Sequence, residues 1–190
     1  MPRKPDSHLE DRIINAAYKL WVAGGEHALT MRAVAKEAET TTPTLYERFK
    51  DKSELLAALR ARAQRKLFDA IEPAQSVTEA ARLALDFTTA HAHEYELLGK
   101  DWASRFSRKE PTPSMDLIKT RLAEQVGGSP DDHSQLALAL AALYNGASMM
   151  LVEESLPAET VSAIKRACVA ATDSLVASAA RKKQIAPKHQ

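Results

Sequence analysis

Apolar residues recur at three- and four-residue spacing along most of the chain, and no stretch alternates apolar and polar residues for long enough to indicate a strand. Caps, prolines and glycines divide this pattern into segments. The chain is therefore expected to be all-α. The predicted helices cover approximately residues 8–23, 30–38, 41–49, 51–71, 76–98, 115–126, 130–152 and 157–183, with a short helix around 102–106.

Two short helices joined by a tight turn are predicted between residues 29 and 50. Thr30 and Thr41 are good N-caps for them, and Pro43 falls in the first turn of the second helix, where a missing N–H does no harm. The apolar spacing turns one face of each helix inward. The inward residues are Met31, Val34, Ala35 and Ala38 in the first helix, and Leu45 and Phe49 in the second.

The outward face of this helix pair carries hydroxyls, one phenol and cations. Such groups suit phosphates and the edges of bases, so the pair is typical of a DNA reader. Long polar side chains and helix starts at the edges of the pair are expected to meet the phosphates, whereas the threonines at the start of the second helix lie nearest the bases. The candidates for phosphate are Thr30, Arg32, Tyr46 and Lys52, those for bases are Thr41, Thr42, Pro43 and Thr44, and Arg48 and Lys50 complete the face.

The run Ala38-Glu39-Thr40-Thr41-Thr42-Pro43-Thr44-Leu45-Tyr46-Glu47-Arg48-Phe49-Lys50-Asp51-Lys52 resembles the end of the amino-terminal domain of TetR-family transcriptional regulators. The resemblance extends over residues 8 to about 60. The positions that match the family pattern are Thr41, Thr44, Leu45, Tyr46, Phe49 and Lys52.

Two residues depart from the family pattern. Glu39 stands where the family prefers a glycine that ends the first helix in a left-handed conformation, which costs a non-glycine residue roughly 1 kcal/mol. The turn is therefore expected to differ slightly. Arg48 replaces the usual His or Tyr and adds a cation near the DNA backbone.

The resemblance implies a three-helix helix-turn-helix DNA-binding domain, assigned to 1–52, and a carboxy-terminal helical effector-binding and dimerisation domain, assigned to 53–190. It implies a homodimer through the last two helices, a palindromic double-stranded DNA operator, and release of a repressor by a small-molecule effector. The residues of 136–152 and 157–183 support the dimer, because they carry more apolar and small-residue surface than one monomer of this size can bury. The alternative is that 136–152 forms the central core helix of a monomer.

An effector cavity between the helices of the second domain is also implied by the resemblance. Aromatic residues are few in this chain, and apolar walls with a few polar tips are what small-molecule sites are made of. Core packing explains each large side chain equally well on its own. The candidates for effector binding are Phe87, His91, Tyr95, Trp102, Phe106, Tyr144, Met149 and Met150.

A net charge of +1 over 190 residues gives no overall basic field, so DNA binding has to depend on a local patch. Cys168 is the only cysteine and is read as a small buried hydrophobe, which suits a reducing cytoplasm. No signal peptide and no apolar run near the ~20 residues needed to cross a bilayer occur, so a cytoplasmic protein without a membrane partner is expected.

No residue set for catalysis is recognised. The chain has no nucleophile elbow, glycine-rich phosphate loop or His-Glu-x-x-His helix, so an enzyme is not expected. His91 and His93 would point about 200° apart on one helix and cannot share an ion, and no metal or cofactor is expected. The near-zero charge keeps one rival open, an all-helical binding or scaffold protein that has kept the fold without recognising DNA.

Overall fold

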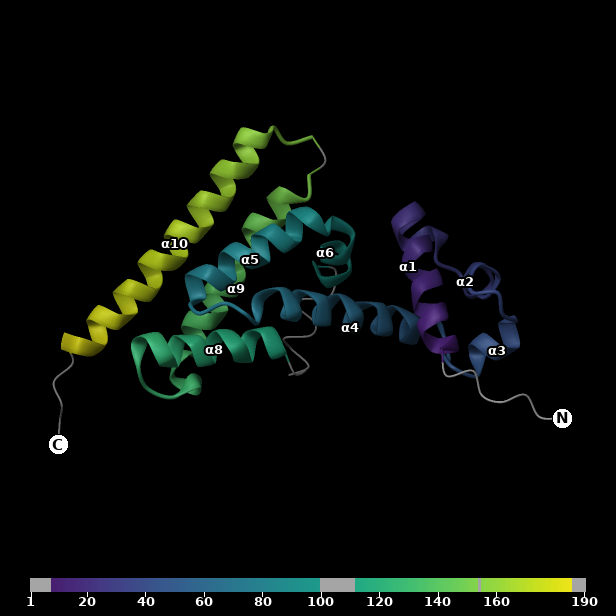
Figure 1. Cartoon of the computed structure of the whole chain (residues 1–190), viewed down its shortest axis with the longest axis horizontal. Helices are drawn as coiled ribbons and strands as arrows, with labels where there is room; N and C mark the ends of the chain where they lie inside the picture. The colour runs from purple at the N-terminus through teal and green to yellow at the C-terminus, as the bar shows by residue number, and fades with distance from the viewer. Residues whose placement is uncertain (1–7, 100–111, 154, 186–190) are drawn as a thin grey trace. The chain divides into compact units, whose positions relative to one another are not determined.

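The structure, a computed structural model, describes residues 8–99, 112–153 and 155–185. The secondary structure of these ranges is helical throughout, which confirms the predicted all-α class (Figure 1). Contacts divide the chain into two compact units, Met1–Ala63 and Gln64–Gln190. Each unit is described by itself.

The first unit consists of α1 (Leu9–Ala28), α2 (Met31–Glu37), α3 (Thr42–Tyr46) and the first part of α4 (Lys52–Ile71). α2 packs against both α1 and α3. The apolar stripes predicted from the sequence supply its buried side chains. These include Leu9, Ile13, Ala16, Ala17, Trp21, Leu29, Val34, Ala35, Ala38, Leu45, Phe49, Leu55, Leu56, Leu59 and Ala63.

The Gly24-Gly25 pair breaks α1 but does not end it, which corrects the predicted stop. Gly25 has a φ of 60°, in the left-handed region that favours glycine, and a further helical turn follows as far as Ala28. Lys52 Nζ donates a hydrogen bond of 2.8 Å to the backbone oxygen of Glu26 in this added turn. A carbonyl exposed by the broken helix is thus satisfied from the start of α4.

α4 runs without interruption from Lys52 to Ile71, as predicted, and Asp51 Oδ1 caps it by accepting from Glu54 N at 2.9 Å. The division between the two units falls inside this helix, after Ala63, rather than at its start. Arg62 shows why: its guanidinium donates to Asn15 Oδ1 and lies 6.0 Å from the centre of the Tyr18 ring, so both contacts are with α1.

The second unit contains the rest of α4, α5 (Val77–Ala90), α6 (Ala92–Gly99), α8 (Pro113–Val126), the short 3-10 helix η1 (Pro130–His133), α9 (Ser134–Leu151) and α10 (Ala158–Ile185). The long α10, yellow in Figure 1, packs along α5, α9 and α8, and α5 also packs on α9. Cys168 of α10 is buried in the cluster formed by these helices, and burial raises the pKa of its thiol.

Two predicted helices of the second unit are each divided. The segment 76–98 breaks at His91 (φ −137°, ψ 53°) into α5 and α6, although Ser76 caps its start as expected by accepting from Glu79 N at 3.0 Å. The break rotates the residues that follow, so that Glu94 and Tyr95 become buried. After Ser129 the chain forms η1 first, and α9 begins only at Ser134.

Candidate DNA-binding surface and ligand cavity

The turn between α2 and α3 has the left-handed geometry that the family's glycine would adopt, which corrects the expected deviation. Glu39 has a φ of 53° and is the one described residue other than glycine with a positive φ. Thr40 N donates to Ala35 O at 2.9 Å and Glu39 N to Lys36 O at 3.2 Å. These two bonds form a Schellman motif, which satisfies the last carbonyls of α2. Glu39 thus adopts the left-handed backbone conformation in place of a glycine, at a cost in backbone strain.

Threonines cap both helices of the pair. Thr30 Oγ1 accepts from Ala33 N at 3.2 Å, and Thr41 Oγ1 accepts from Thr44 N at 3.3 Å. The hydroxyl oxygens of Thr41 and Thr44 are also 2.8 Å apart, so the two hydroxyls hydrogen-bond to each other. The remaining hydrogen-bonding capacity of the two hydroxyls, together with the two methyl groups, is available to a partner at this end of α3.

The candidate DNA-binding residues lie together on α2, on α3 and on the residues that flank them. Tyr46 is 50% exposed although it belongs to a helix whose Leu45 is fully buried. The Lys52 ammonium, one of the candidate groups, is bound to Glu26 O inside the unit. The exposed candidates are Thr30, Arg32, Thr41, Pro43, Tyr46, Arg48 and Lys50, and the half-buried ones are Thr42, Thr44 and Lys52.

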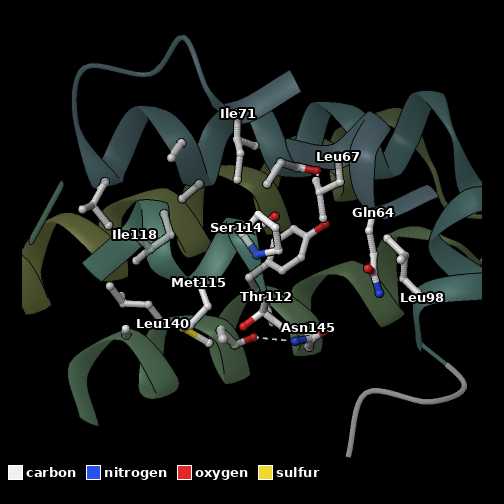
Figure 2. A pocket seen from close by; sticks show the side chains of 18 of the residues that line it. Gln64, Leu67, Ile71, Leu98, Thr112, Ser114, Met115, Ile118, Leu140 and Asn145 are labelled. Carbon is white, nitrogen blue, oxygen red and sulfur yellow. Dashed lines mark hydrogen bonds between the residues drawn. The ribbon is translucent and has the colours of Figure 1, made fainter. Parts of the chain in front are cut away.

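A cavity of about 170 Å³ lies in the second unit. Figure 2 shows Leu67 and Ile71 of α4 on one side of it and Leu140 and Asn145 of α9 on the other. None of the described lining residues carries a formal charge. The space comes from alanines that face it at four-residue spacing, Ala80 and Ala84 of α5 and Ala137 and Ala141 of α9.

Two phenols bring polar atoms to this apolar cavity. Thr88 Oγ1 donates to Ala84 O at 3.1 Å and lies 2.9 Å from Tyr144 Oη and 3.1 Å from Ser148 Oγ. Tyr144 Oη also lies 3.5 Å from Ala84 O, so the Tyr144 hydroxyl donates either to Thr88 or to this carbonyl. Burial raises the pKa of Tyr144, so this phenol stays protonated.

Tyr95 is the second phenol, and its hydroxyl donates to the backbone oxygen of Asn145 at 3.1 Å. Its ring meets the Tyr144 ring edge to face, with centroids 6.4 Å apart. Burial, and after it the neighbouring Tyr144, raise the pKa of Tyr95 to about 12. At neutral pH the cavity is therefore lined by neutral phenols.

The first unit is similar to a known family. Residues 13–59 match the family model of bacterial regulatory proteins of the tetR family. The chain carries a TetR-family DNA-binding domain. The matched range covers α2, the left-handed turn and α3, where the candidate DNA-binding residues lie. No protein of the curated set matches the chain significantly.

Solved structures extend the likeness from the TetR-family domain to the whole chain. A transcriptional regulator of Streptomyces coelicolor described as a TetR superposes with a TM-score of 0.68 at 18% identity, over 90% of this chain and 97% of its own. A TetR-like transcriptional regulator from a Rhodococcus species gives 0.60 at 21%, over 92% and 96%. A TetR-family regulator from Haemophilus influenzae gives 0.58 at 20%, over 89% and 98%. The fold of the second unit is thus also that of TetR-family proteins.

The candidate effector residues scatter in this TetR-family fold. Tyr95 and Tyr144 line the cavity. Phe87 is buried and stacks on His91, with ring centroids 4.7 Å apart, and His91 itself is exposed. Two candidates face solvent instead, since Met149 is 69% and Met150 57% exposed, and Trp102 and Phe106 lie outside the described residues.

Sequence reasoning missed most of the cavity because it searched for large side chains. The space is bounded by aliphatic residues and alanines, with Asn145 and Thr172 as further polar atoms. A signal was present in the alanines of α5 and α9, since small side chains leave space wherever the helices do not approach each other closely.

The described residues give no sign of a metal centre. Within them no group of three or more His, Cys, Asp or Glu side chains is close enough to hold an ion. His91 Nδ1 lies 3.8 Å from Glu94 Oε1, and His93 Nδ1 lies 3.9 Å from Glu96 Oε2, so the two histidines have different carboxylate partners. No helix in the described ranges has the length and hydropathy to span a bilayer.

Proposed function

We propose that this protein is a DNA-binding transcriptional regulator, a repressor that binds a palindromic operator as a homodimer and is released by a small-molecule effector. The observation that carries the proposal is the exposed polar face of α2 and α3, held by a Schellman turn and two threonine caps within a range that matches the TetR family. It catalyses no reaction in this proposal.

The side chains of this face divide into two roles. Thr30, Arg32, Tyr46 and Lys52 contact phosphates, with Arg48 and Lys50 adding positive charge, and these contacts fix the position of the protein on the duplex. The start of α3 enters the major groove, where hydroxyls bond to base edges and methyl groups meet thymine. The base contacts come from Thr41, Thr42, Pro43 and Thr44.

DNA binding is tested with duplexes that the protein enriches from a random pool. Arg32→Ala should weaken binding to all sequences about equally and reduce the slope of affinity against salt by about one unit, because one phosphate contact is lost. Arg82→Ala, at an exposed arginine of α5 outside the last two helices, is the matched control and should change neither quantity. A wild-type affinity that does not depend on salt would contradict the proposal and favour the scaffold alternative.

Base reading has its own test. Thr44→Ala should change which half-site the protein enriches while leaving the salt slope as it was, because a base contact carries sequence information and a phosphate contact does not. If the selected sequence is the same for both proteins, Thr44 reads no base.

Exposed apolar side chains on α9 and α10 support the dimer. Met149 and Met150 are more than half exposed and Leu175 is 40% exposed. In a two-fold assembly of these helices such side chains pack on a second copy. Leu175→Glu should dissociate the dimer in sedimentation, whereas Val22→Glu, with 41% exposure in the first unit, should not. A monomeric wild-type protein at micromolar concentration would refute the interface.

Effector release is proposed because α4 belongs to both units. It begins at Lys52 beside α3 and supplies Leu67 and Ile71 to the cavity. A ligand that moves this helix would shift the α2–α3 pairs of the two subunits away from the spacing of about 34–36 Å that successive major grooves require. Coupling is reciprocal: a tenfold loss of operator affinity, about 1.4 kcal/mol, must be matched by a tenfold loss of ligand affinity on operator.

A further inference from the structure

The cavity of the second unit has a feature that selects among ligands: none of the described residues that line it is charged. Its lining combines aliphatic side chains with neutral phenol, amide and hydroxyl groups throughout the described residues. Burying an ionised group without a partner costs several kcal/mol or more. A carboxylate or an ammonium ligand would meet no opposite charge here, so the cavity disfavours both.

Most hydrogen atoms of the inner polar groups are already committed to the protein. Tyr95 donates to the backbone oxygen of Asn145, and Thr172 Oγ1 donates to Cys168 O at 2.9 Å. Asn145 Nδ2 donates to Ala141 O at 2.8 Å, the dashed line in Figure 2. Apart from the second N–H of the Asn145 amide, what these groups present to the cavity is oxygen lone pairs.

The hydroxyl proton of Tyr144 is likewise committed to the protein, because it goes to Thr88 Oγ1 or to Ala84 O. The other polar residues of the lining do not favour ligands that carry only hydrogen-bond acceptors. Thr112 and Ser114, at the start of α8, have hydroxyls that can rotate to donate or to accept, and the Gln64 amide has both kinds of atom. The inner wall around Tyr95 therefore has several acceptors and, in the second N–H of Asn145, a single further donor.

The volume indicates the size of the group that fits between the described residues. An apolar protein cavity of roughly 150 Å³ accommodates one benzene molecule, and this one has about 170 Å³. We propose that the cavity binds an uncharged molecule of one ring that carries a hydrogen-bond donor, of the phenol or cyclic-alcohol class, and that the donor bonds to Tyr95 Oη and Asn145 Oδ1. This inference rests on the proposed function in one respect, that the cavity is the effector site.

Three probes of similar size test the ligand class by calorimetric titration of the full-length protein. Phenol donates a hydrogen bond, toluene has the same shape without a donor, and benzoate is charged at neutral pH. Phenol should bind about 3- to 10-fold more tightly than toluene, which is the usual net contribution of one hydrogen bond. Benzoate should bind at least about 100-fold more weakly than phenol, because its charge has no partner.

Variants then locate the hydrogen bond. Tyr95→Phe removes one acceptor and Asn145→Leu the other, and the double variant should weaken phenol at least about fivefold while changing toluene less than about twofold. Tyr18→Phe in the first unit is the matched control and should leave both affinities unchanged. Circular dichroism verifies that each variant is folded. An affinity for toluene that falls together with that for phenol would show a packing defect and would overturn the assignment.

The other outcomes are equally decisive. Three results would overturn the proposed class. They are an affinity for toluene equal to that for phenol in the wild type, an affinity for benzoate within about tenfold of that for phenol, and no binding of any probe at millimolar concentration. Operator affinity is measured in parallel. If phenol binds with the expected selectivity and operator affinity stays constant, the ligand class holds and effector release fails; if operator binding is salt-dependent and no probe binds, the regulator stands and the ligand class falls.

Discussion

The two units of this protein differ in where their polar side chains lie: those of the first unit face solvent, and those of the second are buried. In the first unit the distinctive side chains point outward, and Tyr46 is half exposed on a helix held by the buried Leu45. In the second unit the polar side chains Thr88, Tyr95 and Ser148 are buried and hydrogen-bonded around or near a cavity. The first arrangement suits a large polyanion that approaches from outside, and the second suits a small molecule that is enclosed.

The comparison also concerns how each unit is stabilised. The first unit has short helices, of 7 and 5 residues in α2 and α3, which depend on caps and on a few buried side chains. The second unit has helices as long as the 28 residues of α10 and can tolerate a cavity among them. Four predictions test this difference, beginning with the largest expected effect.

Removing a core leucine should impair first the function of the unit that contains it. Leu45→Ala in α3 and Leu122→Ala in α8 each remove a fully buried side chain and should cost about 2–5 kcal/mol of unfolding free energy. Leu45→Ala should abolish operator binding and leave binding of phenol in the second unit intact, whereas Leu122→Ala should weaken phenol binding first. Urea denaturation and both binding assays measure this. Equal damage to both functions by both variants would show that the units do not act separately.

Alkaline pH should reveal the buried phenol of the second unit. The pKa of Tyr95 rises from 10.0 to about 12 on folding, so the unfolded state loses its proton first as the pH rises. The contribution of Tyr95 to stability is therefore fully present below pH 10 and is lost between pH 10 and about 12, by about 2–3 kcal/mol.

Tyr95→Phe is the control for this titration, because phenylalanine has no proton to lose. The difference in unfolding free energy between variant and wild type should be constant below pH 10 and should move in favour of the variant above it. Urea midpoints measured across this range suffice, and parallel curves for the two proteins would contradict the burial of this phenol.

Loss of the N-cap of α2 should lower the stability of the first unit. Thr30→Val keeps the shape of the side chain but removes the oxygen that accepts from Ala33 N, and it should cost about 1 kcal/mol. Thr120→Val, at an exposed position within α8, removes a hydroxyl that bonds only to Asp116 O in its own helix. Thermal melting should show no loss for this control, and an equal loss in both would mean that Thr30 does not act as a cap.

The smallest expected effect is a gain. Glu39→Gly relieves the left-handed strain of the turn between α2 and α3 and should raise the unfolding free energy by about 1 kcal/mol. Glu39→Ala keeps a Cβ at the same φ and should give no gain. A gain in both variants would place the effect in the charge of Glu39 rather than in its backbone.

The sequence predicted the local structure of the first unit well, because that structure follows from local rules. The caps at Thr30 and Thr41, the inward Leu45 and the uninterrupted α4 depend on spacing and on neighbours within one helical turn. It placed the left-handed position at Glu39 but expected the turn to deviate there, since the backbone bonds that impose the geometry cannot be read from residue types.

The interior of the second unit was decided by tertiary packing. The break at His91, which turns Tyr95 toward Asn145, leaves no mark in the helical periodicity on either side of it. Met149 and Met150 are apolar by composition yet face outward, because the face a helix buries depends on which helices pack against it. The chain itself thus determined an all-α fold and an outward polar face, whereas the location, neutrality and acceptor character of the cavity exist only where distant helices meet.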